Sequence, residues 1–257
     1  MRNALKLFFA GIGTICFGLL WPLTAFAQGH VIKDQNVTLS SFKDPLKYSI
    51  YLPEKYCVNN RLYPILYLLH GYGGSHNDWL KSGRIAKTLD RLIANQMIDP
   101  MVVVMPAAGK SWYLNSAKHG SFQSGLGQEL LVVMEDLLAN KVSKEKRAIA
   151  GLSMGGGQSL NFGLTHLDKF AWVGGFSSAP NTKSPAELVP DPEAAKKQLK
   201  LLWLSCGNKD GLIRVSQGMQ RHLKKNDVPH IWNVDGHGHD ATHWRNNLYH
   251  FAQKLFK

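Results

Sequence analysis

The sequence predicts one α/β domain with a doubly wound, mostly parallel sheet and helices on both of its faces. Short apolar runs alternate with amphipathic segments of helical spacing along most of the chain, which is typical of a parallel sheet with helical crossovers. Several of the short runs are apolar throughout, as in strands that are covered on both faces. Residues 28–257 are enough for one well-buried domain and too few for two ordinary ones.

The first 27 residues have the pattern of a signal peptide. Two basic residues precede a nearly uncharged apolar run from Leu7 to Leu23, and Ala25-Phe26-Ala27 supplies a small-x-small cleavage motif. A retained membrane anchor is the alternative, but the apolar stretch is marginal for spanning a bilayer. We therefore expect residues 1–27 to be removed from an exported protein, secreted or periplasmic, with no stable membrane insertion after cleavage.

Apolar runs of strand length account for the predicted sheet. The first two runs alternate between apolar and polar residues, which is typical of an antiparallel pair at a sheet edge. Most later runs are apolar throughout and predict buried strands. In chain order the predicted strands are Val37–Ser41, Leu46–Leu52, Pro64–His70, Met101–Met105, Lys146–Gly151, Phe170–Phe176, Lys200–Cys206 and His230–Val234.

Segments with apolar residues three and four positions apart lie between most of these runs and predict helices. Thr182–Glu193 contains three prolines and is expected to be an irregular connection instead. In chain order the predicted helices are Ile85–Met97, Gly127–Leu138, Gly155–His166, Leu212–Lys224 and Trp244–Phe256.

The segment from Gly151 to Gly155 reads Gly-Leu-Ser-Met-Gly at the predicted passage from a buried strand to a helix. A serine on such a sharp turn adopts strained backbone geometry, and its hydroxyl stands clear of the sheet edge. The flanking glycines remove side chains that would clash at the bend. A chance glycine-rich turn is the alternative, but the strand and helix on either side favour Ser153 as a nucleophile.

A serine hydroxyl needs a base, and the base needs a carboxylate that orients it. Ligands bind outside the carboxyl ends of parallel strands, so residues directly after strands are the candidates. Asp210 follows a predicted strand and is favoured as the acid. Asp227 at a helix end and Asp235 at the end of the last strand are weaker candidates.

Three histidines, His237, His239 and His243, follow the last predicted strand. His239 lies in a short loop that can bring an imidazole over the sheet edge, whereas His243 is expected to start the closing helix. The order Ser153, Asp210, His239 is the one expected when the nucleophile comes first in the chain. We therefore expect His239 to be the general base, with His237 as the main alternative.

The same three histidines, together with Asp240, superficially resemble a zinc-ligand cluster. Their spacing departs from the dinuclear pattern His-x-His-x-Asp-His, because Ala241 and Thr242 stand where Asp and His are needed. The sequence also contains no His-Glu-x-x-His motif. We therefore predict no metal site and no cofactor.

A developing oxyanion needs two preorganised N–H donors, and the loss of one such donor typically costs about 3 kcal/mol. Met154 follows the nucleophile and supplies the first backbone N–H. The second is expected from the loop His70–Gly74, where Gly71 and Gly73 let the backbone approach a substrate carbonyl. An ordinary glycine turn is the alternative, and His70 itself is expected to hold this loop.

Three aromatic residues, Trp79, Trp112 and Tyr113, lie in predicted loops after strands. They are expected to stack on a sugar ring or on an aromatic acyl group of the substrate. Packing in the core or at the rim of a pocket is the alternative for each.

The chain carries a formal net charge of +12, from 30 Lys and Arg against 18 Asp and Glu. Its basic residues are scattered and are not interleaved with aromatic residues, so no nucleic-acid partner is expected. Removal of the leader leaves two cysteines, Cys57 and Cys206. Their pairing stays open, because a disulfide needs α-carbons within about 7 Å and Cys206 in an apolar strand is equally consistent with a free buried thiol.

These motifs together resemble the esterase family that includes esterase D (S-formylglutathione hydrolase), the feruloyl and acetyl-xylan esterases of carbohydrate esterase family 1 and the mycolyltransferase antigens. The resemblance implies an α/β-hydrolase fold with Ser153, Asp210 and His239 as the triad. It also implies Tyr72 and Met154 as the two backbone oxyanion donors. It covers roughly Leu46 to Phe256 and rests on Tyr63–Gly74, Gly151–Gly156, Gly207–Asp210, Gly238–Asp240 and Trp244-Arg245.

One departure from the family concerns the loop before the closing helix. The family often has two glycines before its final histidine, whereas here His237 precedes Gly238. We therefore expect an extra imidazole, that of His237, at the entrance of the pocket.

The sequence thus predicts an exported serine carboxylesterase that forms an acyl-enzyme on Ser153. By resemblance, its substrates are acyl or feruloyl esters of polysaccharides or other sugar alcohols. An acyltransferase of the same fold and a non-catalytic carbohydrate-binding protein are the alternatives. The acyl group, the alcohol and the oligomeric state stay open.

Overall fold

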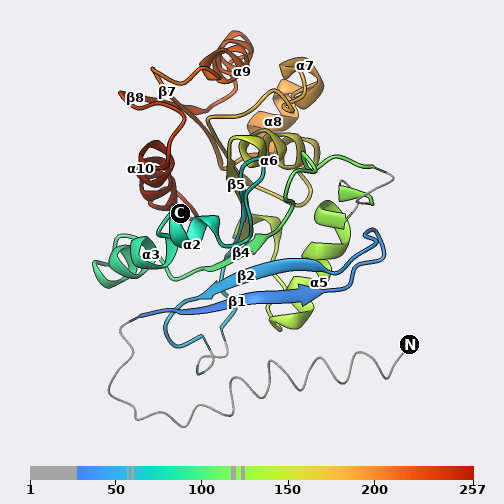
Figure 1. Cartoon of the computed structure of the whole chain (residues 1–257). Coiled ribbons are helices and arrows are strands. Elements are labelled where there is room, and N and C mark those ends of the chain that lie inside the picture. Colours follow the sequence, from blue (N-terminus) through green and yellow to red (C-terminus); the bar gives the residue numbers. More distant parts are fainter. Residues whose placement is uncertain (1–27, 57, 59–60, 117–119, 123–124) are drawn as a thin grey trace.

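The described part of the chain folds around one eight-stranded sheet (Figure 1). This computed structural model describes residues 28–257 except 57, 59–60, 117–119 and 123–124. The predicted signal peptide and Cys57 lie outside the described residues.

The order of the strands in this sheet is β1-β2-β4-β3-β5-β6-β7-β8. The pairs β1–β2 and β2–β4 are antiparallel, and all further neighbours in the sheet are parallel. The carboxyl ends of the six parallel strands therefore meet at one edge. The strands are β1 (His30–Val37), β2 (Leu46–Leu52), β3 (Ile65–Leu69), β4 (Val102–Pro106), β5 (Arg147–Leu152), β6 (Trp172–Phe176), β7 (Leu201–Gly207) and β8 (Ile231–Asp235).

Helices cover both faces of the sheet, as the sequence predicts (Figure 1). On one face α2 (Asp78–Lys81), α3 (Ile85–Ala94) and α10 (Ala241–Ala252) share a hydrophobic cluster. The helices that share the cluster on the other face are α5 (Leu130–Leu137), α6 (Met154–Thr165), α7 (Pro185–Leu188), α8 (Pro192–Gln198) and α9 (Ile213–Lys225).

The central strand β3 shows how both faces are built from one apolar run. Its side chains alternate, so that Leu66 and Leu68 pack on the α3 face while Tyr67 and Leu69 pack on the α6 face. All five of its residues are buried. Burying one such leucine contributes roughly 1.5–3 kcal/mol, which favours a run without charged positions.

The first strand differs from its predicted bounds. The sequence predicts Val37–Ser41, but β1 runs from His30 to Val37 and pairs antiparallel with β2. β1 is the edge strand, and most of its residues are exposed or half-buried. A strand with so little burial needs no apolar run, and the hydrophobic pattern therefore could not locate it.

Two short helices occupy the segment that its prolines predict to be irregular. Ser184 caps α7 by a reciprocal capping box with Glu187, and Pro185 follows as the first helical residue. Asp191 caps α8 by accepting from the N–H of Ala194, and Pro192 again follows as the first helical residue. Proline fits the first turn of a helix because its missing N–H has no intrahelical partner there.

Two helices begin at other residues than their apolar spacing indicates, since α5 begins later than the predicted Gly127 and α10 begins earlier than the predicted Trp244. The α5 helix is preceded by a π-helical turn over Gly125–Glu129. The α10 helix begins at Ala241, because the side chain of Asp240 accepts hydrogen bonds from the N–H groups of Thr242 and His243.

Candidate active site

Ser153 occupies the turn between β5 and α6 and has φ 53° and ψ −117°. A positive φ is strained for a serine and persists only where the surroundings enforce it. Here the N–H of Ser153 donates to the carbonyl of Phe176 at 2.8 Å, and its own carbonyl accepts from Ala179 at 3.0 Å. The end of β6 therefore holds the serine in this conformation.

The glycines around Ser153 are required by close contacts. A β-carbon at Gly155 would lie 2.5 Å from the carbonyl oxygen of His70, and one at Gly151 would lie 2.5 Å from the backbone of Gly155. Both distances are shorter than any normal carbon contact, so α6 can approach β3 and β5 only with glycine at these positions.

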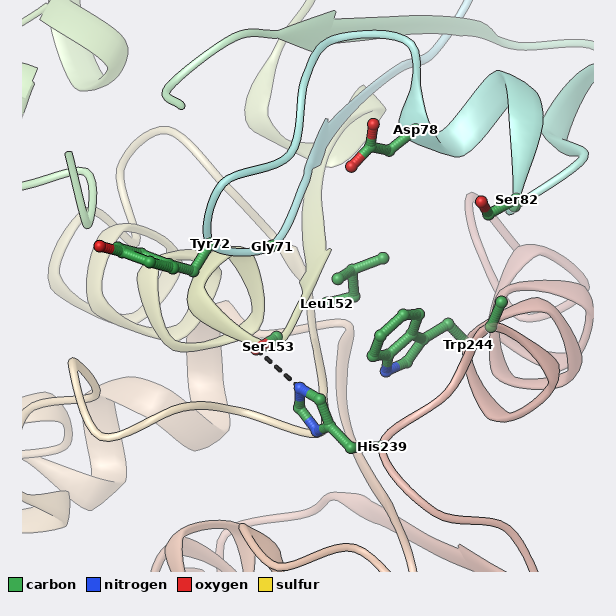
Figure 2. A pocket seen from close by; sticks show the side chains of 10 residues that line it. Gly71, Tyr72, Asp78, Ser82, Leu152, Ser153, His239 and Trp244 are labelled. Atoms are coloured by element: carbon green, nitrogen blue, oxygen red, sulfur yellow. Dashed lines mark hydrogen bonds between the residues drawn. The ribbon is translucent and has the colours of Figure 1, made fainter. Parts of the chain in front are cut away.

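The structure brings Ser153, Asp210 and His239 together at the carboxyl edge of the sheet. His239 Nε2 lies 2.9 Å from Ser153 Oγ, and His239 Nδ1 lies 2.8 Å from Asp210 Oδ2. Figure 2 shows the imidazole of His239 beside the serine hydroxyl. Because a carboxylate only accepts, Nδ1 carries the proton toward Asp210 and Nε2 is free to accept from Ser153.

Asp210 is buried and remains ionised. Burial raises the pKa of this carboxyl, but hydrogen bonds from the N–H of Leu212, from Ser177 and from His239 outweigh burial and hold its pKa below the ordinary value. The Leu212 N–H donates to Asp210 Oδ1 at 2.8 Å. The side chain of Asp210 is 0% exposed, so its charge acts on the imidazole with little screening by water.

The alternative candidates for acid and base lie elsewhere. Asp227 is an exposed residue after α9. Asp235 and His243 pair with each other at 2.8 Å. The backbone of His237 bonds Asp235 and Lys209, and its side chain is not among those that line the pocket, so an extra imidazole at the entrance stays a prediction.

The loop after β3 lies against the nucleophile turn. A β-carbon at Gly71 would lie 2.7 Å from Leu152 Cδ1 and 3.4 Å from Ser153 Cβ. Gly73 has φ 72°, and its N–H donates to the carbonyl of Gly109 at 2.9 Å. The loop is therefore fixed close to Ser153, with Tyr72 between two glycines and Met154 at the start of α6.

His70 holds this loop, as the sequence predicts. Its Nδ1 donates to the carbonyl of Gly71 at 2.7 Å, and its Nε2 accepts from the N–H of Ala108 at 2.8 Å. Burial lowers the pKa of His70 below its ordinary value, which favours the neutral imidazole that this donor–acceptor pattern requires.

Two of the three aromatic residues expected at the substrate face the core instead. Trp79 lies in α2, is 1% exposed and donates from Nε1 to the carbonyl of Leu69. Tyr113 is 0% exposed, and its hydroxyl bonds the backbone of His70. Both rings carry a polar group that finds its partner at the end of β3, so both support the loop after this strand and neither lines the pocket.

Trp112, the third of these residues, lies beside the pocket and stacks on Tyr72. The two ring centroids are 4.6 Å apart with an interplanar angle of 31°. Tyr72 is 51% exposed. Trp112 has a φ of 60°, a left-handed conformation that a tryptophan adopts only where its surroundings impose it. The Tyr72 side chain is therefore supported from one face and open to solvent.

Ser153 opens into a cavity of about 350 Å³ (Figure 2). Several residues that line this cavity were not predicted from the sequence. They belong to α2 and to the start of α10, whose sequences carry no pattern that marks a pocket. Trp244 packs edge-on to His239 with centroids 5.1 Å apart. The lining residues are Gly71, Tyr72, Asp78, Ser82, Gly83, Leu152, Ser153, His239, Ala241 and Trp244.

Among the described residues, no three His, Cys, Asp or Glu side chains are grouped as they would be around a metal ion. No described helix has the length and apolarity to cross a membrane. Cys206 is a free, buried thiol in β7. Burial and the neighbouring Asp210 raise its pKa to about 12.

Comparison with known proteins agrees with this architecture. The endo-1,4-beta-xylanase/feruloyl esterase of Xylanibacter ruminicola is 31% identical over 221 residues, which cover 81% of this chain and 29% of that protein. The acetyl esterase of Caldicellulosiruptor saccharolyticus is 25% identical over 70% of this chain and 78% of its own length. A solved ferulic acid esterase superposes with a TM-score of 0.79 at 25% identity, covering 88% of this chain and 96% of that structure.

The chain thus spans less than a third of the xylanase/feruloyl esterase that it matches. The family model described as "Putative esterase" matches residues 40–254, which include the turn at Ser153, the Asp210 loop and the His239 loop. The chain therefore belongs to this esterase family and has its α/β-hydrolase fold.

Proposed function

We propose that this protein is an exported serine carboxylesterase that hydrolyses acyl or feruloyl esters of sugar hydroxyls through an acyl-enzyme on Ser153. One observation carries the proposal. The imidazole of His239 lies 2.9 Å from the Ser153 hydroxyl on one side and 2.8 Å from the buried Asp210 carboxylate on the other. This is the geometry that makes a serine hydroxyl nucleophilic at neutral pH.

The reaction follows from this arrangement. His239 Nε2 takes the proton of Ser153 while Oγ attacks the ester carbonyl, and Asp210 stabilises the imidazolium that forms. The oxyanion accepts hydrogen bonds from the backbone N–H groups of Tyr72 and Met154. The tetrahedral intermediate then expels the alcohol, which takes the proton from His239. Water attacks the acyl-enzyme in the same way, with His239 again as the base, and releases the acid.

The walls of the cavity support a substrate that contains a ring with hydroxyl groups. Leu152 and Trp244 offer apolar surface, while Asp78 and Ser82 offer hydrogen-bonding groups in the same cavity. Next to the cavity, the exposed ring of Tyr72 on Trp112 offers a flat surface on which a sugar or phenolic ring can stack.

The names of the related proteins support the same substrate class. One relative combines a xylanase with a feruloyl esterase, and another is an acetyl esterase. One similar structure holds ferulic acid. Feruloyl and acetyl groups on a plant polysaccharide are therefore the first substrates to test.

The test compares the wild-type protein with Ser153→Ala on nitrophenyl acetate, methyl ferulate and acetylated xylan. We expect the wild type to hydrolyse at least one of these esters and the variant to hydrolyse none at a measurable rate. Turnover by Ser153→Ala comparable to that of the wild type would exclude this mechanism. Export is tested separately by fractionating the producing cells, where the mature protein is expected to begin at Gln28.

A further inference from the structure

Asp235 and His243 form a second histidine–carboxylate pair beside the candidate triad. His243 Nδ1 lies 2.8 Å from Asp235 Oδ2, and His243 Nε2 lies 3.2 Å from Ser205 Oγ. His243 and Ser205 are both 0% exposed. The three residues repeat the types found in the triad, but their serine is sealed in the core and has no access to a substrate.

The pair connects the two elements on either side of the His239 loop. Asp235 is the last residue of β8, and His243 lies in the first turn of α10. Asp240 reinforces this connection, because its side chain accepts from the N–H groups of Gly238 and His243. His239 thus lies between Gly238 and Asp240, which are both held by these hydrogen bonds.

Asp235 also connects this loop to the loop that carries Asp210. Its Oδ1 accepts from the N–H of His237 at 3.1 Å, and its backbone carbonyl accepts from the N–H of Asn208 at 2.8 Å. The carbonyl of His237 in turn accepts from the N–H of Lys209 at 3.1 Å. A single carboxylate therefore lies at the point where the Asp210 and His239 loops meet.

We propose that Asp235 and His243 are positioning residues for ester hydrolysis. His243 fixes the orientation of the Asp235 carboxylate, and Asp235 fixes the turn that places His239 within hydrogen-bond distance of both Ser153 and Asp210. This role rests on the proposed function. A displacement of about 1 Å in a reacting group can cost on the order of a hundredfold in rate, so a loose His239 loop lowers kcat without weakening substrate binding.

The sharpest test compares His243→Leu with His243→Asn. The two side chains are similar in size, and both leave Ser205 without its imidazole partner, but only asparagine places an N–H near the position of Nδ1. We expect kcat on nitrophenyl acetate to fall about tenfold to a hundredfold in His243→Leu, with KM nearly unchanged. We expect His243→Asn to retain most of the wild-type kcat.

A control separates positioning from loss of stability. Leu248 is a core residue of α10 and belongs to the hydrophobic cluster on the α3 face of the sheet. Leu248→Ala is expected to lower the melting temperature while kcat, measured well below that temperature, stays near wild type. If His243→Leu does not fold, Asp235→Ala removes the same hydrogen bond at its other end. The side chain of Asp235 is 23% exposed, so this variant disturbs the core less, and we expect an equal loss of kcat.

The rate at which a phosphonate probe labels Ser153 distinguishes the possible failures. Slow labelling of His243→Leu beside fast labelling of His243→Asn supports the positioning role. Equal rates in wild type and His243→Leu would overturn it and leave the proposed function standing, as would an equal loss in the leucine and asparagine variants. A wild-type protein that is not labelled at all would overturn both.

Discussion

Asp210→Asn isolates the role of one charge in the candidate triad. Asparagine has the shape of aspartate, so its side-chain oxygen can still accept from the N–H of Leu212, which lies 2.8 Å from Oδ1. Its amide nitrogen then faces His239 Nδ1, which lies 2.8 Å from Oδ2 in the wild type. Two donors cannot face each other, so the imidazole places its proton on Nε2.

A proton on Nε2 removes the acceptor for the Ser153 hydroxyl. The corresponding substitution in a serine protease lowers kcat about 10⁴-fold with little change in geometry. At 1.36 kcal/mol for each factor of ten, this corresponds to about 5 kcal/mol of transition-state stabilisation. We therefore expect kcat of Asp210→Asn on nitrophenyl acetate to fall by about four orders of magnitude.

The matched control is Asp227→Asn, which makes the same chemical change at an exposed position after α9. We expect it to keep the wild-type kcat and melting temperature. A folded Asp210→Asn variant that keeps kcat within about tenfold of the wild type would refute the assignment of this carboxylate, because it would show that the imidazole does not depend on it for its tautomer.

Three further outcomes are expected. The β-carbon of Gly155→Ala would lie 2.5 Å from the carbonyl oxygen of His70, so this variant should lower the free energy of unfolding, measured in urea, by about 1–3 kcal/mol. Gly218 in α9 has open space around it, so Gly218→Ala should raise the same free energy by about 0.4–1 kcal/mol. Cys206, with a pKa of about 12, should resist iodoacetamide in the folded protein at mildly alkaline pH and react only in denaturant, as followed by mass spectrometry. The pKa of Asp210 in the folded protein lies below its ordinary value of 3.8, so the charge of this carboxylate stabilises the fold above pH 3.8. The difference in unfolding free energy between wild type and Asp210→Asn should therefore shrink as the pH falls through the folded-state pKa.

The residues that meet at the candidate site could be foreseen because they share one topological property. Ser153, Asp210 and His239 each follow a parallel strand, and parallel strands of one sheet end at the same edge. Hydrophobic periodicity locates β5 and β7 well because both are largely buried, whereas β8 is only half-buried and is marked by a short apolar alternation. The positions of the three side chains then follow from the strand order.

Features that depend on how loops fold back could not be foreseen in the same way. Trp79 and Tyr113 follow strands as the triad residues do, yet both turn into the core, because their polar groups bond the backbone at the end of β3. The pairing of Asp235 with His243 is equally invisible in the sequence, since only the packing of α10 on β7 and β8 places the two side chains together.

The nucleophile, the acid and the base stand on the ends of β5, β7 and β8, and 86 positions separate Ser153 from His239. A refolding intermediate with β1 to β6 in place would already hold Ser153 in its turn, because Phe176 at the end of β6 accepts the hydrogen bond of its N–H, and yet it would turn over no ester. The recovery of esterase activity during refolding should therefore report the docking of β8 and α10. The time by which activity returns after the far-ultraviolet circular dichroism signal would measure how late in folding this docking occurs.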